Sequence, residues 1–113
     1  GSQASIVTTV TTPTIDISGG SIGAYTAIIQ DYNGNPMPAG SIIELKTTNG
    51  ILLTSGSYTV PVTDIPTGSR YVGVTDFPFM LYKDGTSGLT GVLTITVTTP
   101  LKVKTELAIP VQD

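Results

Sequence analysis

Three residue types that carry much of protein chemistry are missing: the 113-residue chain has no cysteine, no histidine and no tryptophan. Without cysteine and histidine, zinc, copper and haem lose their usual ligands. A serine nucleophile also lacks its usual histidine base, so acid–base work at neutral pH would fall to carboxylates or tyrosine. We therefore expect a protein that is not an enzyme and carries no cofactor.

Charge is also scarce. Charged residues make up 12% of the chain, and the net charge is -3. Nucleic-acid binding needs a basic face that neutralises phosphates, so no nucleic-acid partner is expected. No apolar run is long enough to cross a membrane, so direct membrane insertion is not expected either. The five basic residues are scattered: Lys46, Arg70, Lys83, Lys102 and Lys104.

Short segments that alternate apolar and polar residues fill most of the chain, separated by glycine, proline and asparagine. The clearest runs from Gly91 to Thr98, where three apolar residues alternate with threonines. This pattern predicts a half-buried strand. A second alternating segment, Leu101 to Ile109, follows after Pro100, and the short turn between the two segments predicts an antiparallel hairpin.

The other segments complete an all-β pattern. Further strands are predicted at residues 15–17, 25–30, 43–46, 58–63, 71–74 and 79–82. Asn49-Gly50 predicts a two-residue hairpin, because a type I′ turn needs positive φ at both central residues. Pro61 lacks a backbone donor, so its strand is expected at a sheet edge. About seven to nine strands at such spacing predict an immunoglobulin-like antiparallel β-sandwich.

Alternate apolar residues of these strands are expected to point inward. The chain ends are expected at opposite poles, on the reasoning that the first and last strands of such a sandwich run in opposed senses. Replacing an inward residue by alanine should then cost stability. The predicted inward residues are Ala27, Ile29, Ile43, Leu45, Val60, Leu93, Ile95, Val97, Val103 and Leu107.

The first residues differ in composition from the rest. Gly1-Ser2 looks like an expression scar, which suggests a piece cut from a longer chain. A threonine-rich stretch follows from Thr8 to Thr14. We assign residues 1–13 to the scar plus a linker or first edge strand, and residues 14–113 to one immunoglobulin-like domain.

One stretch resembles a known family. Residues 31–40, D-Y-N-G-N-P-M-P-A-G, resemble a loop of the bacterial immunoglobulin-like domains of invasin, intimin and related adhesins. Residues 42–52 look like that family's next strand and turn, and residues 88–97 resemble its penultimate strand. The good match covers roughly a quarter of the chain. Residues 55–82 are longer than the family's usual middle segment, and its acidic-glycine motif survives only loosely, as Asp84-Gly85.

The resemblance implies a role. Domains of this family act mainly as stacked spacers, with occasional adhesive tips. It therefore implies a monomeric structural module of a bacterial cell-surface or secreted protein, outer membrane-associated or extracellular, whose partners are neighbouring domains. Two alternatives stay open: a module that binds carbohydrate or a host protein through loop aromatics, and a pilus or phage-tail subunit that exchanges strands.

One loop has spacing that suggests a metal. Asp31, Asn33 and Asn35 follow the one-three-five spacing of a calcium loop. However, Pro36 and Ile42 stand where such a loop needs glycine and glutamate. Asparagine and glycine are also ordinary turn formers. These three residues are weak metal candidates, and an ordinary loop is the favoured interpretation.

Aromatic residues offer the second candidate site. Tyr32, Phe77, Phe79 and Tyr82 could form an exposed contact patch on a loop held by Pro78. The alternative interpretation is a core strand, which is favoured because buried aromatics are the common case. The five tyrosines could also form a sugar platform, for which the sequence supplies no shared face.

Overall fold

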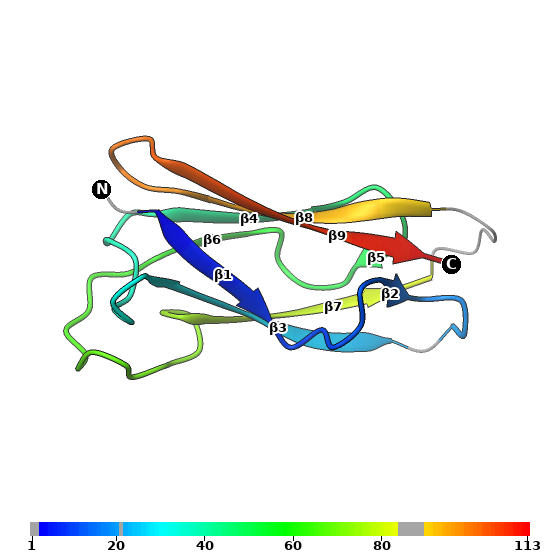
Figure 1. Cartoon of the computed structure of the whole chain (residues 1–113), viewed down its shortest axis with the longest axis horizontal. Helices are drawn as coiled ribbons and strands as arrows, with labels where there is room; N and C mark the ends of the chain where they lie inside the picture. Colours follow the sequence, from blue (N-terminus) through cyan, green and yellow to red (C-terminus); the bar gives the residue numbers. More distant parts are fainter. Residues whose placement is uncertain (1–2, 21, 84–89) are drawn as a thin grey trace.

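The computed structural model describes residues 3–20, 22–83 and 90–113, and these form an elongated sandwich of two sheets measuring 44 × 24 × 22 Å (Figure 1). The described residues contain strands and no helix. Accordingly, no helix there is long and apolar enough to span a membrane. The strands are β1 (Ala4–Thr8), β2 (Ile15–Asp16), β3 (Gly23–Asp31), β4 (Ile42–Thr47), β5 (Ile51–Leu52), β6 (Ser57–Thr59), β7 (Asp76–Tyr82), β8 (Thr90–Thr98) and β9 (Lys104–Gln112).

The strand order confirms the immunoglobulin-like sandwich. One sheet has the order β1-β3-β7-β5 and the other β2-β9-β8-β4-β6. These are the two layers of an immunoglobulin domain, with the N-terminal segment crossing from one sheet to the other between β1 and β2. Neighbouring strands are antiparallel except β2 and β9, which pair in parallel. The threonine-rich start therefore follows an edge strand, β1, and connects it to β2.

The core lies between the two sheets and follows the predicted alternation. On β7, Phe77, Phe79 and Leu81 are fully buried, and their neighbours along the strand are not. Eight of the ten residues predicted to point inward are buried; Val103 and Leu107 are only half-buried. Val103 lies in the turn before β9, and Leu107 lies on β9, which is flanked on its far side only by the two-residue β2.

The two-residue hairpin predicted at Asn49-Gly50 is wrong. β4 and β5 lie in different sheets, so the chain crosses the sandwich here. Gly50 has a φ of 83°, but Asn49 does not have positive φ. Instead, the Asn49 side chain is buried, and its Nδ2 donates to the carbonyl oxygen of Val111 at 3.4 Å. Because the buried Asn49 side chain has its own hydrogen-bond partner, this segment forms a buried corner between the sheets rather than an exposed turn.

Two glycines make this corner sterically possible. A Cβ at Gly50 would lie 2.9 Å from the carbonyl oxygen of Tyr82, and a Cβ at Gly91 would lie 2.6 Å from the Cβ of Asn49. Both distances are too short for real atoms. The corner therefore depends on glycine at a position with positive φ and on a second glycine that makes room for the asparagine.

Several strand boundaries also differ from prediction. Residues 71–74 form a turn rather than a strand: the carbonyl oxygen of Tyr71 accepts bonds from the N–H groups of Val74, Thr75 and Asp76. β6 ends at Thr59, before Pro61, although it is an edge strand as expected. β9 starts only at Lys104. The predicted turn at residues 83–88 and the Asp84-Gly85 motif lie outside the described residues, apart from Lys83, as does Gly1-Ser2.

The chain ends lie at opposite poles, as expected, but for a different reason. β1 begins at one end of the long axis and Asp113 lies at the other (Figure 1). The expected opposed senses of the first and last strands are wrong: β1 and β9 point the same way along the long axis (Figure 1), and β2 pairs in parallel with β9. When the first and last strands run in the same direction, the chain begins at one pole and ends at the other. The loops after β3, β6 and β8 all gather at the N-terminal pole (Figure 1).

The turn between β8 and β9 carries local strain. The N–H of Lys102 donates to the carbonyl oxygen of Thr99 at 2.8 Å, and the N–H of Thr99 donates to the carbonyl oxygen of Val103 at 2.9 Å. Lys102 has a φ of 69°, and no other described non-glycine residue has positive φ. A side chain in this conformation costs about 1–2 kcal/mol, so the turn holds Lys102 against its backbone preference.

Core substitutions test the alternation. Replacing Ile95 or Leu45 by alanine should lower the free energy of unfolding by about 2–5 kcal/mol, because each is buried between the sheets. Urea unfolding measures the loss. The control, Thr94→Val on the outer face, should change stability by less than about 0.5 kcal/mol. Losses below that value at both core positions would show that the alternation is reversed.

Glycine at position 102 should stabilise the protein. Lys102→Gly removes the strained side chain and should raise the free energy of unfolding by about 0.5–1 kcal/mol, after the entropic cost of glycine. The matched change Lys104→Gly, in β9, should lower it by about 0.5–1 kcal/mol. Both changes are measured by urea unfolding. A destabilised Lys102→Gly protein would show that the backbone at Lys102 is not strained.

Candidate functional site

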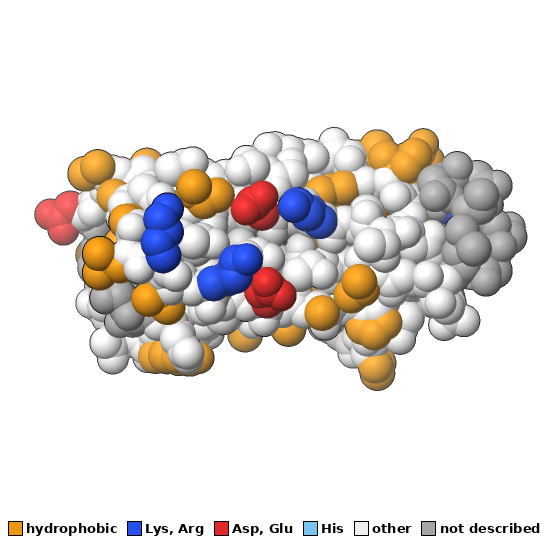
Figure 2. Space-filling model, turned by 90° about the horizontal axis from the view of Figure 1, so that it is seen from above, with side chains coloured by type: hydrophobic (Ala, Val, Ile, Leu, Met, Phe, Trp, Pro, Cys, Tyr) orange, Lys and Arg blue, Asp and Glu red, His pale blue; other side chains and the backbone are white. Residues whose placement is uncertain are grey.

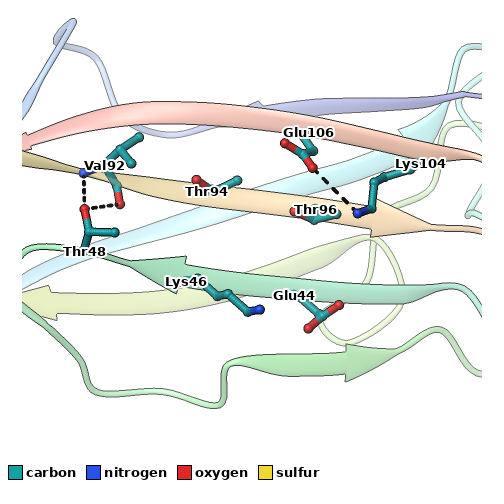
Figure 3. Close-up of a pocket in the computed structure, with 8 residues that line it drawn as sticks. All are labelled: Glu44, Lys46, Thr48, Val92, Thr94, Thr96, Lys104 and Glu106. Atoms are coloured by element: carbon teal, nitrogen blue, oxygen red, sulfur yellow. Dashed lines mark hydrogen bonds and ion pairs between the residues drawn. The ribbon is translucent and has the colours of Figure 1, made fainter.

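A shallow trough of about 340 Å³ runs over the outer face of the five-stranded sheet (Figure 3). Its lining comes from the start of the β4–β5 connection and from three adjacent strands, β4, β8 and β9. The sequence pattern had placed most of these side chains outward one by one. Only the pairing of β4 with β8 and of β8 with β9 brings them together. The lining residues are Glu44, Lys46, Thr48, Val92, Thr94, Thr96, Lys104 and Glu106.

Strand register sets the charge pattern of the trough. Glu44 and Glu106 flank Thr96 in one row across the sheet, and Lys46 lies beside Thr94 in the next row. Lys104 is the fourth charged residue, so two carboxylates and two ammonium groups cancel. Seen from above, this face carries few charged side chains, and apolar side chains gather toward its two ends (Figure 2). The trough is therefore polar and electrically balanced.

The interactions within the trough are weak or local. Lys104 Nζ lies 3.9 Å from Glu106 Oε1, and both side chains are more than half exposed. Such an exposed pair contributes little to stability. The hydroxyl of Thr48 accepts a bond from the N–H of Val92 at 2.9 Å (Figure 3). Among the lining residues no hydroxyl is hydrogen-bonded to a carboxylate, the contact that would activate a serine or threonine as a nucleophile.

The candidate calcium loop is held together by its own hydrogen bonds. Asp31 Oδ1 accepts bonds from the N–H groups of Asn33 at 2.8 Å and Asn35 at 2.9 Å. The side-chain oxygen of Asn35 accepts a bond from the Thr67 hydroxyl at 2.8 Å. Two of the candidate ligand oxygens thus already have partners within the protein. The carboxylate of Asp31 acts as the cap of a turn, a common use of aspartate.

The candidate contact patch does not form as a unit. Phe77 and Phe79 have no exposed surface, which favours the core interpretation and removes them from any contact surface. Phe79 packs on Tyr25 with ring centroids 5.6 Å apart, and Phe77 packs on Tyr58 at 5.2 Å. Both phenylalanines belong to a strand paired with β3, so alternation turns them into the sandwich.

The remaining aromatic candidates lie apart. Tyr32 is 70% exposed on the loop after β3, at the N-terminal pole. Tyr82 is half-buried at the end of β7, toward the opposite pole. Tyr25 and Tyr58 pack against the core phenylalanines. The tyrosines therefore share no single platform.

One carboxylate has a shifted pKa. The Ser18 hydroxyl and backbone N–H donate to the exposed carboxylate of Asp16, and this lowers its pKa below the usual 3.8. A lowered folded-state pKa favours the folded state above the unfolded pKa. That contribution is lost as the pH falls through the folded-state value, so it matters only in acid.

Comparison with known proteins adds no relative. No protein-family model matches the chain, and no curated protein is similar enough in sequence to count as a homologue. Any function must therefore be argued from the residues and their arrangement.

Removing the loop cap should destabilise the protein independently of calcium. Asp31→Ala loses two hydrogen bonds to backbone donors and should cost about 1–2 kcal/mol. Asn33→Ala removes a candidate oxygen but no side-chain hydrogen bond of the loop, and should change stability by less than about 0.5 kcal/mol. The thermal midpoint of the unaltered protein should be the same in calcium and in chelator. A calcium-dependent rise in the thermal midpoint that Asp31→Ala abolishes would contradict the assignment of Asp31 as the cap of the turn.

Proposed function

We propose that the chain is a non-catalytic immunoglobulin-like spacer module of a bacterial cell-surface or secreted protein, contributing to adhesion by holding other domains at a distance. The observation that carries the proposal is the placement of the chain ends at opposite poles of a body 44 Å long and little more than half as wide (Figure 1). Modules with such ends can be joined in line. The surface location rests on the family resemblance of residues 31–40.

The terminal strands also suit a load-bearing role. β2 pairs in parallel with β9 at Ile15–Val111 and Asp16–Gln112. The N–H of Ile17 donates to the carbonyl oxygen of Gln112 at 2.8 Å. When the two ends are pulled apart, parallel strands slide against each other, so their hydrogen bonds are loaded together. An unzipping geometry would load them one at a time.

The strand-exchange alternative is disfavoured by the sheet edges. Ser55 Oγ bonds both the N–H and the carbonyl oxygen of Ser57 on the outer edge of β6. The Tyr58 hydroxyl donates to the carbonyl oxygen of Pro78 on the open side of β7 at 3.1 Å. Pro110 removes one backbone donor from the outer edge of β9. Occupied edge groups and edge prolines are how proteins prevent edge pairing.

The ligand-binding alternative keeps one supporting observation. Tyr32 and Tyr71 are both more than half exposed on loops of the N-terminal pole. Binding of a glycan or host protein by these loops would be lost on Tyr32→Ala or Tyr71→Ala, measured with a glycan array or a pull-down. A ligand bound at micromolar affinity or better would replace the spacer proposal.

Pulling the molecule along its axis tests the spacer role. The chain has no cysteine, so introduced cysteines give unique handles. With handles at Gln3→Cys and after Asp113, single-molecule unfolding should need a clearly higher force than with handles at Gln3→Cys and Leu101→Cys. The second pair lies at one pole and peels β1 from its end. Equal forces in the two geometries would argue against a load-bearing spacer.

A further inference from the structure

A second groove, of about 240 Å³, lies at the N-terminal pole between residues 36–39 and 61–65. Its two walls are joined at both ends. At one end the N–H of Val60 donates to the carbonyl oxygen of Ser41 at 2.9 Å. At the other, the N–H of Gly68 donates to the carbonyl oxygen of Gly34 at 2.8 Å. Between these bonds no backbone hydrogen bond joins the walls, so the groove is a slot in a closed frame.

One wall of the slot is a segment without backbone partners. Residues 62–65 make no backbone hydrogen bond within the described part of the chain, and residues 62–64 are exposed. Pro61 and Pro66 bracket the segment, and a residue before proline prefers extended backbone. The two prolines thus restrict the backbone at both ends of the segment toward a conformation that can pair with another strand, which lowers the entropy that pairing costs.

The slot also has apolar surface and one free charge. Met37 is buried at its base, and Pro36 and Pro38 line the opposite wall. Val62 is 92% exposed, the highest value among the exposed large apolar residues described. The carboxylate of Asp64 lies on the rim and forms no ion pair within the described residues. An occupant should therefore supply backbone hydrogen bonds, an apolar side chain and a positive charge.

We propose that this slot docks an extended segment of a partner protein, which pairs its backbone with residues 62–65. An apolar side chain of that segment packs between Val62 and Pro36–Pro38, and a lysine or arginine lies beside Asp64. Main-chain pairing gives affinity in such complexes and the side-chain contacts give specificity. The proposal goes beyond the spacer role and stands whether or not the domain bears load.

A second copy of the chain is a poor occupant. Its own residues 62–65 have free backbone groups, but they carry Asp64 and neither lysine nor arginine, so self-pairing would bring two carboxylates together. A partner segment must instead combine free backbone donors and acceptors with a positive charge. A separate polypeptide with these features is therefore the fitting partner.

A defined peptide tests the proposal. The probe is acetyl-Val-Lys-Val-Lys-Val-amide, added to the ¹⁵N-labelled protein. Amide shifts should change at Met37, Ala39 and residues 62–65, and should saturate at roughly 0.1–1 mM peptide. A peptide with glutamate in place of lysine should bind more weakly by roughly two- to fivefold or more, and one with N-methylated backbone should lose at least about tenfold.

Matched variants separate the slot from the rest of the surface. Asp64→Asn should weaken binding of the lysine peptide by roughly two- to fivefold, and Glu106→Gln, an equal charge change on the outer sheet face, should not weaken it. The proposal is overturned by the absence of shifts at millimolar peptide, by shifts outside the slot, or by equal binding of the glutamate or N-methylated peptide. Concentration-dependent shifts at the slot without peptide would overturn it in favour of self-association.

Discussion

Close packing of the two sheets through alternate side chains is the constraint on which the rest of the structure depends. Phe77, Phe79 and Leu81 fill one side of the interior, and Leu93, Ile95 and Val97 fill the other. A slip of one residue in β7 or β8 would turn the whole set to solvent, because side chains alternate along a strand. The register of these central strands therefore sets every other pairing in its sheet.

The corner at Asn49 links this packing to the course of the chain. Its buried amide bonds the carbonyl oxygen of Val111 in the last strand, so the crossing between the sheets is tied to the C-terminal end of the molecule. The close approach of Gly91 belongs to the same contact. Because the chain changes sheet here, β4 and β5 lie in different layers, and the chain crosses back between β5 and β6.

That arrangement divides the surface into regions with different chemistry. The outer sheet face carries threonines and balanced charges, whereas the N-terminal pole carries Tyr32, Val62, Tyr71, Val72 and Leu101 in exposed positions. Side-chain hydrogen bonds occupy edge groups of β6 and β7, and proline interrupts the outer edge of β9. Exposed apolar residues at the pole where the loops gather suit contacts between modules joined end to end. Edge groups that are already occupied suit a module that does not pair with its neighbours along its sides.

The sequence by itself determined which residues face inward on β3, β4 and β8. The alternation in residues 91–98 and 43–46 could be read directly, because period-two burial is a local property of an extended chain. Pro61 correctly indicated an edge strand, because its missing backbone donor is also a local property. The fold class also follows from local signals, since short alternating segments separated by turn residues allow few arrangements other than a sandwich.

Tertiary structure alone decided which strands became neighbours. Asn49-Gly50 has the composition of a hairpin turn, yet a buried hydrogen bond to a residue more than sixty positions away makes it a corner. The trough exists only because β4 lies beside β8, and the slot only because residues 36–39 face residues 61–65. Local periodicity fixes the face that a side chain occupies, but contacts between distant segments depend on the total packing energy of the whole chain, which no short stretch of sequence contains.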